Sequence, residues 1–164
     1  MAVAKTVSVK IPAGVDNGSR LRLTNEGGPG QLGGPQGDLY VFIYVEDHEF
    51  FQRRDNHIIC TVPISFVQAA LGDKIKVPTL NGDKKLRIPK GTQPGDVLYF
   101  KEEGIPSLRT GRRGDQVIQI EIKTPTHLSK KQEALLKEFA ELESSKLSKK
   151  LKNILKGGAS QAAN

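Results

Sequence analysis

The chain of 164 residues contains no tryptophan, one methionine and a single cysteine, Cys60. One cysteine excludes an internal disulfide and fits a reducing compartment, so we expect a cytoplasmic protein. No apolar run approaches the roughly 18 residues that a membrane-spanning helix requires. The first ten residues lack the apolar core of a secretion signal. These absences argue against secreted and membrane proteins, and we expect no membrane partner.

Sequence patterns that indicate catalysis are also missing. His48, His57 and His127 lie far apart, and none of them stands at a metal-ligand spacing from the cysteine. The chain contains no G-x-S-x-G, P-loop or G-x-G-x-x-G motif. Cys60 lies in an apolar stretch that is typical of a buried strand, where a thiol acts as a small hydrophobic side chain. We therefore predict that this chain is not an enzyme and holds neither a metal nor a cofactor.

Positive charge is in excess, with a formal net charge of +7. From residue 128 onward there are eight Lys and four Glu, a net charge of +4, and the remaining residues contribute only +3. Arg109, Arg112 and Arg113 form a basic loop, but no aromatic side chains accompany them as stacking platforms for bases. A basic two-module β protein that binds nucleic acid is therefore the alternative hypothesis, and the less favoured one.

An internal repeat organises the chain. At an offset of 77, residues 11–45 match residues 88–122 without gaps, and the phrase Ile-Pro-x-Gly opens both copies. Recurring glycines predict turns, and the alternating apolar residues between them predict strands. The strands expected in the first copy are 7–11, 20–23 and 38–45, and those in the second are 85–88, 97–100 and 115–122.

The second copy is preceded by segments that the first copy does not have. These are a strand over 57–65, a short helix with Ser65 as N-cap and Gly72 as stop, and a strand from 73 to 80 that turns at 81–83. Counterparts of residues 59–81 would fall before residue 5. The sequence therefore predicts that the first module is cut at its N-terminal side and that the chain is a fragment of a longer protein.

The predicted fold is mainly β, with two tandem homologous β-sandwich-like modules at 5–58 and 59–126, a short helix in the second module and a C-terminal helical segment. That segment covers 127–156, and a disordered tail is expected over 157–164. Ser129 and Gln132 have capping-box spacing, which predicts a helix from 129 to about 143. A second amphipathic stretch follows after 143–148. The apolar stripes are packed in cis or bury one another in a homodimer; the predicted dimer residues are Leu135, Leu136, Phe139, Leu142, Leu147, Leu151, Ile154 and Leu155.

An aromatic surface distinguishes the first copy from the second. Leu39, Val41, Ile43 and Val45 alternate with Tyr40, Phe42 and Tyr44, so the aromatic side chains share one face of the strand. The second copy has Val117, Gln119 and Glu121 at the aromatic positions, which is typical of a solvent-facing surface. Phe50 and Phe51 follow directly and add apolar area. This surface is either covered by missing residues or used to bind an apolar partner.

The paired Ile-Pro-x-Gly phrases, the stretch AALGDKIKVPTL and the RGD before the last strand fall in an order that resembles the C-terminal region of the DnaJ family of forty-kilodalton heat-shock co-chaperones. The resemblance runs from about Lys5 to Leu155. It implies two β-sandwich-like domains, of which the first binds unfolded polypeptide clients. It also implies a C-terminal helical segment that pairs two protomers, and partnership with a DnaK-type seventy-kilodalton chaperone.

Within this resemblance, Phe51 matches the phenylalanine of the family's client groove. We add Phe50, Phe42 and Tyr44 as candidate client-binding residues, and the alternative for Phe51 is an apolar anchor between the modules. In the family a zinc module precedes the strand that matches residues 5–14, so zinc is expected only in a missing upstream module. The chain has no J-domain with its His-Pro-Asp turn, and we expect it neither to stimulate ATP hydrolysis nor to bind zinc.

Overall fold

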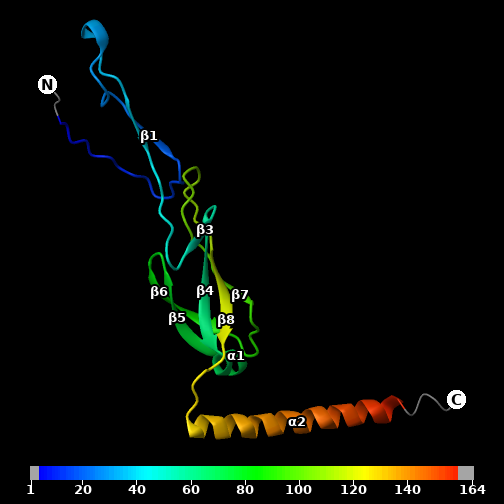
Figure 1. Cartoon of the computed structure of the whole chain (residues 1–164). Coiled ribbons are helices and arrows are strands. Elements are labelled where there is room, and N and C mark those ends of the chain that lie inside the picture. The colour runs from blue at the N-terminus through cyan, green and yellow to red at the C-terminus, as the bar shows by residue number, and fades with distance from the viewer. Residues whose placement is uncertain (1–3, 159–164) are drawn as a thin grey trace. The chain divides into compact units, whose positions relative to one another are not determined.

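A computed structural model describes residues 4–158 of the chain, with side chains described as far as residue 151. The chain divides into two compact units, Met1–Lys123 and Thr124–Asn164, and each is described by itself. The first unit is mainly β (Figure 1). Its elements are β1 (Arg20–Leu23), the 3-10 turn η1 (Gln31–Gly33), β2 (Leu39–Phe42), β3 (Gln52–Arg54), β4 (His57–Ser65), α1 (Phe66–Leu71), β5 (Asp73–Thr79), β6 (Gly82–Ile88), β7 (Val97–Phe100) and β8 (Gln116–Lys123).

The core of this unit lies between a four-stranded sheet and a hairpin. The sheet has the order β3-β4-β8-β7, in which β4 and β8 are parallel and lie side by side (Figure 1), and β5 pairs with β6 in a separate two-stranded sheet. Alternate side chains of each layer are buried and meet in one cluster. The cluster comprises Cys60, Val62, Ile64, Ala69, Val77, Leu86, Ile88, Ile118 and Ile120. This two-layer arrangement confirms the predicted β-sandwich-like fold.

The short helix α1 begins and ends where the sequence predicted. The backbone N–H of Ser65 donates to Oε1 of Gln68 (2.9 Å), and the N–H of Gln68 donates to Oγ of Ser65 (3.1 Å). Two N-terminal donors are thereby satisfied reciprocally, which fixes the first turn. Gly72 follows at φ 76°, and its N–H donates to the carbonyl of Gln68 (2.9 Å). A positive φ at this position favours glycine and ends the helix.

The internal repeat is present in the backbone register. In the first copy Leu21 of β1 pairs with Val41 of β2, and in the second Leu98 of β7 pairs with Ile118 of β8. Both pairs are related by the offset of 77, as are the other three pairs of each ladder. Every side chain therefore keeps its face of the sheet from one copy to the other.

An acidic side chain fixes the same turn in both copies. Asp38 accepts from the N–H of Asn25 (3.0 Å), and Asp115 accepts from the N–H of Glu102 (3.0 Å). Asn25 and Glu102 both have positive φ, 60° and 59°, a conformation that side chains other than glycine rarely adopt. The carboxylates hold the backbone in this conformation, so both aspartates stabilise turns.

Three predicted features of the first unit differ from the structure. Residues 7–11 form no strand, because their counterparts in the second copy pair with β5, and residues 4–158 contain no counterpart of β5 in the first copy. The strand predicted over 38–45 forms only at Leu39–Phe42. The turn between β5 and β6 lies at residues 80 and 81, one position before the predicted one, with Gly82 following at φ 107°.

The second unit contains one continuous helix, α2 (Lys130–Gly158). Its capping box forms as predicted, since Ser129 and Gln132 exchange backbone and side-chain hydrogen bonds of 2.9 and 3.2 Å. The predicted separation at 143–148 is wrong. Oγ of Ser144 and Oγ of Ser145 donate to carbonyls three residues earlier (2.9 and 2.8 Å), so these hydroxyls bond within the helix and do not interrupt it.

Helix α2 extends two residues into the segment predicted to be disordered, and residues 159–164 lie outside the described part of the chain. Neither α1 nor the described length of α2 combines the length and apolarity that crossing a membrane requires.

Candidate functional site

The aromatic side chains of the first copy form an exposed face on β2 and the residues that follow it. Tyr40 is 46% exposed, Phe42 61% and Tyr44 80%. The intervening Leu39 and Val41 are half-buried, so the side chains alternate as the sequence predicted. At the corresponding positions of the second copy, Gln119 and Glu121 are exposed polar residues. One copy therefore presents apolar surface to solvent where the other presents polar surface.

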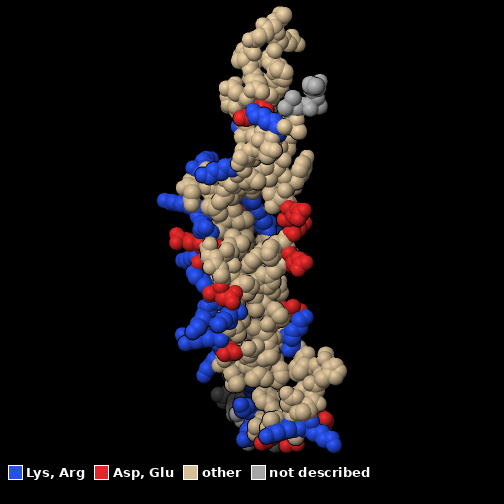
Figure 2. Space-filling model, turned by 90° about the vertical axis from the view of Figure 1, so that its left-hand side faces the viewer, with Lys and Arg blue, Asp and Glu red and all other residues tan. Residues whose placement is uncertain are grey.

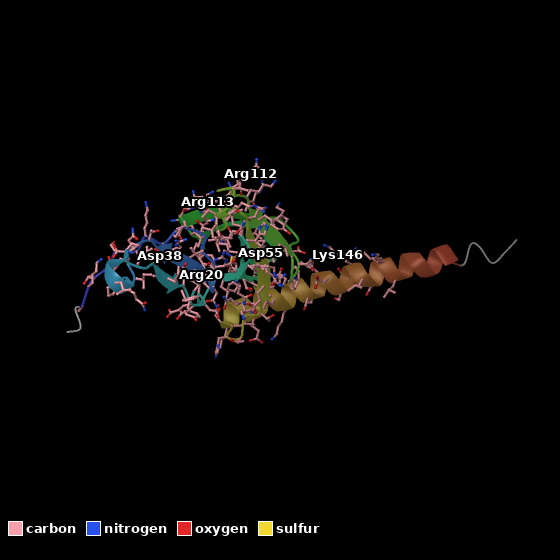
Figure 3. The ribbon with its side chains drawn as sticks, turned by 90° about the horizontal axis from the view of Figure 1, so that it is seen from above. Arg20, Asp38, Asp55, Arg112, Arg113 and Lys146 are labelled. Atoms are coloured by element: carbon pink, nitrogen blue, oxygen red, sulfur yellow. The ribbon has the colours of Figure 1, made fainter. Side chains whose placement is uncertain are left out.

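Charged groups stabilise the strands that carry this aromatic face. The guanidinium of Arg20 lies 4.9 Å from the ring centroid of Tyr40, within cation–π distance. Arg22 donates from Nε to Asp38 (2.6 Å). The hydrogen bond from the N–H of Asn25 and the adjacent Arg22 lower the pKa of Asp38 below its usual value. Figure 3 labels Arg20 and Asp38 in this module. These contacts fix the β1–β2 hairpin without covering Phe42.

Phe50 and Phe51 lie where the first copy meets the second. Both pack against the core cluster, and their rings meet edge to face with centroids 4.9 Å apart. The backbone N–H groups of both residues donate to Nδ1 of His48 (3.0 and 3.2 Å). The imidazole therefore fixes the backbone that presents the two rings, and its own ring lies 5.0 Å from that of Phe51.

A pocket of about 270 Å³ opens beside Phe51. Its apolar walls come from both copies and its rim is charged. Arg53 ties the rim together, since it donates to the carbonyls of Gly14 and Val15 and forms an ion pair with Asp16 (3.0 Å). The lining residues are Asp16, Asn17, Val45, Glu46, Asp47, His48, Phe51, Arg53, Ile58, Leu80 and Ile105. The pocket can hold a few apolar side chains of a partner.

Of the four predicted client-binding residues, the structure places only Phe51 in this pocket. Phe50 lines a neighbouring hollow with Ile59 and Gln119. Phe42 and Tyr44 lie on the exposed strand face described above. The structure brings Phe50 and Phe51 together and leaves the other two as a separate part of the surface.

Several residues of the pocket were not identified from the sequence. The alternation places Val45 on the same face as Leu39 and Val41, but it is 42% exposed and lines the pocket, because β2 ends at Phe42 and the strict alternation ends soon after it. Leu80 and Ile105 reach the pocket from the turn between β5 and β6 and from the loop before β8. No local pattern indicates such contacts, which depend on tertiary packing.

Within its own unit, helix α2 leaves its apolar side chains uncovered. Leu135, Phe139, Leu142, Leu147 and Leu151 are each more than half exposed, and Leu136 is less so. At about 100° per residue, Leu135, Phe139 and Leu142 share one stripe, and Leu147 and Leu151 lie on another about 120° or more around the helix. Leu136 belongs with the second stripe. Ile154 and Leu155 lie within the helix, but their side chains are outside the described part.

The remaining candidates form no chemical site in the structure. Arg112 and Arg113 lie on an exposed loop at the edge of the view (Figure 3), where Arg113 donates to the carbonyl of Gly104 (3.1 Å). Cys60 is buried, and burial raises the pKa of its thiol. Among the described residues no three His, Cys, Asp or Glu side chains come together as metal ligands.

Comparisons with known proteins identify relatives over nearly the whole chain. The model of the DnaJ C terminal domain matches residues 2–125. The chain is 49% identical over 152 residues to "Chaperone protein DnaJ" of Halothermothrix orenii, covering 93% of this chain and 40% of that protein. It is 53% identical over 150 residues to "Chaperone protein DnaJ" of Nitratidesulfovibrio vulgaris strain DP4, covering 92% of this chain and 40% of the relative. The chain thus spans about two fifths of the length of these relatives, and α2 lies outside the matched family model.

Proposed function

Because this chain belongs to the DnaJ C-terminal domain family, we propose that it binds unfolded or non-native polypeptides through the apolar surface of its first module. The observation that carries the proposal is the exposed aromatic strand face, together with the separate pocket at Phe51. A folded monomer gains nothing from exposing Phe42 and Tyr44, whereas a partner's apolar side chains would cover them.

The expected binding is weak and independent of nucleotide. Burying two or three aliphatic or aromatic side chains of a client contributes several kcal/mol before the entropic cost of ordering the segment. The net free energy then stays at or below the about 8 kcal/mol of a micromolar complex, so we expect a dissociation constant on the order of micromolar or weaker. The surface contacts side chains and not a defined sequence, so many unfolded segments would bind with similar affinity.

Two variants test this function against a reduced, unfolded test protein in a fluorescence-anisotropy titration. Phe51→Ala removes the pocket's aromatic wall and is expected to weaken binding about tenfold. Phe42→Ser changes an exposed ring outside the core, so it keeps the test valid if Phe51→Ala unfolds.

Arg112→Ala is the matched control on an exposed loop, and its affinity should stay within twofold of the parent chain. Equal losses for all three variants, with a steep decline in salt, would replace the proposal with electrostatic binding.

We further propose that two chains pair through α2. A helix whose stripes at Leu135 and Leu147 stay exposed needs a partner surface. In a C2 pair, each chain would supply that surface to the other. Sedimentation should show a dimer at tens of micromolar. Deleting residues 144–164 should yield a monomer whose β modules keep their circular dichroism. A monomeric parent chain would mean that the helix packs in cis.

Delivery of clients to a DnaK-type chaperone is the last part of the proposal. The sequence contains no His-Pro-Asp motif, so this chain alone should leave ATP hydrolysis by such a chaperone unchanged. Added in excess to a complete DnaJ and DnaK system, it should slow client refolding, because it would hold clients without transferring them. A stimulated ATPase rate would contradict this separation of roles.

A further inference from the structure

On the hairpin of β5 and β6, positively charged side chains lie directly opposite one another. Its inward side chains Val77, Leu86 and Ile88 are buried in the core. On the outward face Lys74 pairs in register with Arg87, and Lys76 pairs with Lys85. Like charges at directly opposite positions destabilise a sheet. The arrangement therefore opposes the stability of the hairpin and needs a reason other than folding.

No acidic side chain of the described residues forms an ion pair with these four cations. The ion pairs in the described part of the chain use other cations, namely Lys5, Arg22, Arg53, Lys84, Lys123 and Lys137. Asp83 lies on the outward face opposite Pro78, at the end of the hairpin nearest its turn. Asp73 is engaged by Gln68 (2.8 Å). The cations thus lie together toward the α1 end of the hairpin.

A solvated strand face alone does not account for this pattern. Charged side chains on an open strand discourage edge-to-edge association. Side chains of alternating sign would have the same effect and would also attract one another across the two strands. The same unit shows the mixed pattern on β8, where Lys123 and Glu121 form an ion pair of 2.7 Å. Figure 2 views the side on which β5 and β6 lie in Figure 1, and Lys and Arg side chains outnumber the Asp and Glu side chains that lie among them along one margin.

The cationic face continues into an open hollow at the end of α1. The hollow, of about 350 Å³, is lined by Lys74, Arg87 and Lys90 together with Leu71, which is 66% exposed, and Asp73, whose carboxylate accepts from Gln68. The surface therefore comprises Lys74, Lys76, Lys85, Arg87 and Lys90, and we call it the cationic hairpin face.

We propose that the cationic hairpin face binds an acidic polypeptide segment in extended conformation. An extended chain repeats its side-chain direction every two residues, about 6.7 Å, which is also the spacing of Lys74 from Lys76 and of Lys85 from Arg87. Carboxylates at alternate residues would therefore face the cations in register. The outward face has no aromatic side chain on which a base could stack, which favours a peptide over single-stranded nucleic acid. This surface is separate from the Phe51 pocket and does not depend on the function proposed for it.

The test uses the full chain and a fluorescein-labelled peptide of alternating Glu and Thr, eight residues long, in anisotropy titrations at low salt. Lys76→Glu/Lys85→Glu reverses two central charges and should weaken binding at least tenfold. Arg109→Glu/Arg112→Glu makes the same change in charge on an exposed loop of the same module and should change affinity less than twofold. Lys76→Gln/Lys85→Gln removes the charges more mildly and should weaken binding at least threefold.

Absence of binding by the parent chain would overturn the proposal. Equal losses in both reversal variants, or equal binding of a peptide of alternating Lys and Thr, would overturn it too. Tighter binding of a ten-nucleotide oligothymidylate than of the acidic peptide would also overturn it and assign the face to nucleic acid. Peptide binding that is lost in Lys76→Glu/Lys85→Glu, while the unfolded test protein still binds, would separate this face from the aromatic surface.

Discussion

Single side chains at the edge of the core connect the hairpin to the rest of the second copy. Glu103 is 8% exposed, accepts from Nδ2 of Asn81 (3.1 Å) and forms an ion pair with Lys84. Lys84 also lies over the ring of Phe100, 5.9 Å from its centroid. One carboxylate therefore joins the turn between β5 and β6, strand β6 and the loop after β7.

The pKa of Glu103 makes this connection depend on pH. The hydrogen bonds from Lys84 and Asn81 lower the pKa below its usual value near 4.5, so the carboxylate stabilises the fold above that pH. Glu103→Gln should lower the free energy of unfolding by about 1–2 kcal/mol at pH 7. In urea titrations the difference should shrink as the pH falls below about 4.5 and through the folded-state pKa. A difference that grows on acidification would contradict the assignment.

Gln116 is a fully buried amide in the core. Its Nε2 donates to the carbonyl of Pro78 (2.9 Å) and lies 3.4 Å from Sγ of Cys60, while Oε1 has no hydrogen-bond partner. Gln116→Leu removes the unpaired oxygen and also the bond to Pro78, so the free energy of unfolding should change by less than about 1 kcal/mol. Gln116→Ala adds a cavity and should cost about 2 kcal/mol or more in the same denaturation experiment. Equal costs for the two variants would mean that the hydrogen bond from the Gln116 amide to the carbonyl of Pro78 dominates.

At the scale of the element, repulsion between cations that lie opposite one another lowers the stability of the hairpin of β5 and β6. Lys85→Glu places an acid opposite Lys76 and should raise the free energy of unfolding by about 0.2–1 kcal/mol. The gain should fall as salt is added, because both side chains are exposed. Lys123→Glu breaks the pair with Glu121 and should change stability in the opposite direction. Loss of stability in Lys85→Glu would remove the argument that the hairpin is electrostatically strained.

The local sequence pattern predicted an element correctly wherever the element and the strand that it pairs with are both present in the chain. The alternation in β4 and β8, the caps at Ser65 and Ser129, and the repeat itself all follow from spacing, and the structure contains them. The strand expected at 7–11 has the pattern but no partner in the described chain. The interruption expected at 143–148 failed because serine hydroxyls can bond within a helix as well as end one. The pocket beside Phe51 depends on residues such as Leu80, whose position only the tertiary structure fixes.

The continuity of α2 changes what its apolar residues can do together. A helix of 29 residues extends about 44 Å at 1.5 Å per residue. Since the stripe of Leu135 and the stripe of Leu147 lie on different sides of this rod, one flat partner surface cannot cover both. A pairing that buries both stripes must therefore contact the helix from more than one side.

At the scale of the whole molecule, the predicted absence of metal applies to the complete chain. With one buried cysteine and no cluster of ligands among residues 4–151, a stable zinc site would need groups that the fold holds apart. Elemental analysis of the purified chain should find less than about 0.1 zinc per chain. A stoichiometric metal that survives dialysis against a chelator would contradict this expectation.

The parallel pairing of β4 with β8 also sets the order in which the second copy can fold. Ile58 pairs with Gln116, which is synthesised 58 positions later. At about 5–20 residues per second, β4 leaves the ribosome roughly 3–12 seconds before its central partner exists. Until then β4 lacks its parallel neighbour, and Cys60, Val62 and Ile64 lack the Ile118 and Ile120 side chains that complete their cluster, even after the β5–β6 hairpin has been synthesised. Long-range pairing of this kind is slow. For those seconds the nascent chain is itself an unfolded polypeptide with an exposed apolar strand, the kind of molecule that the finished protein is proposed to bind.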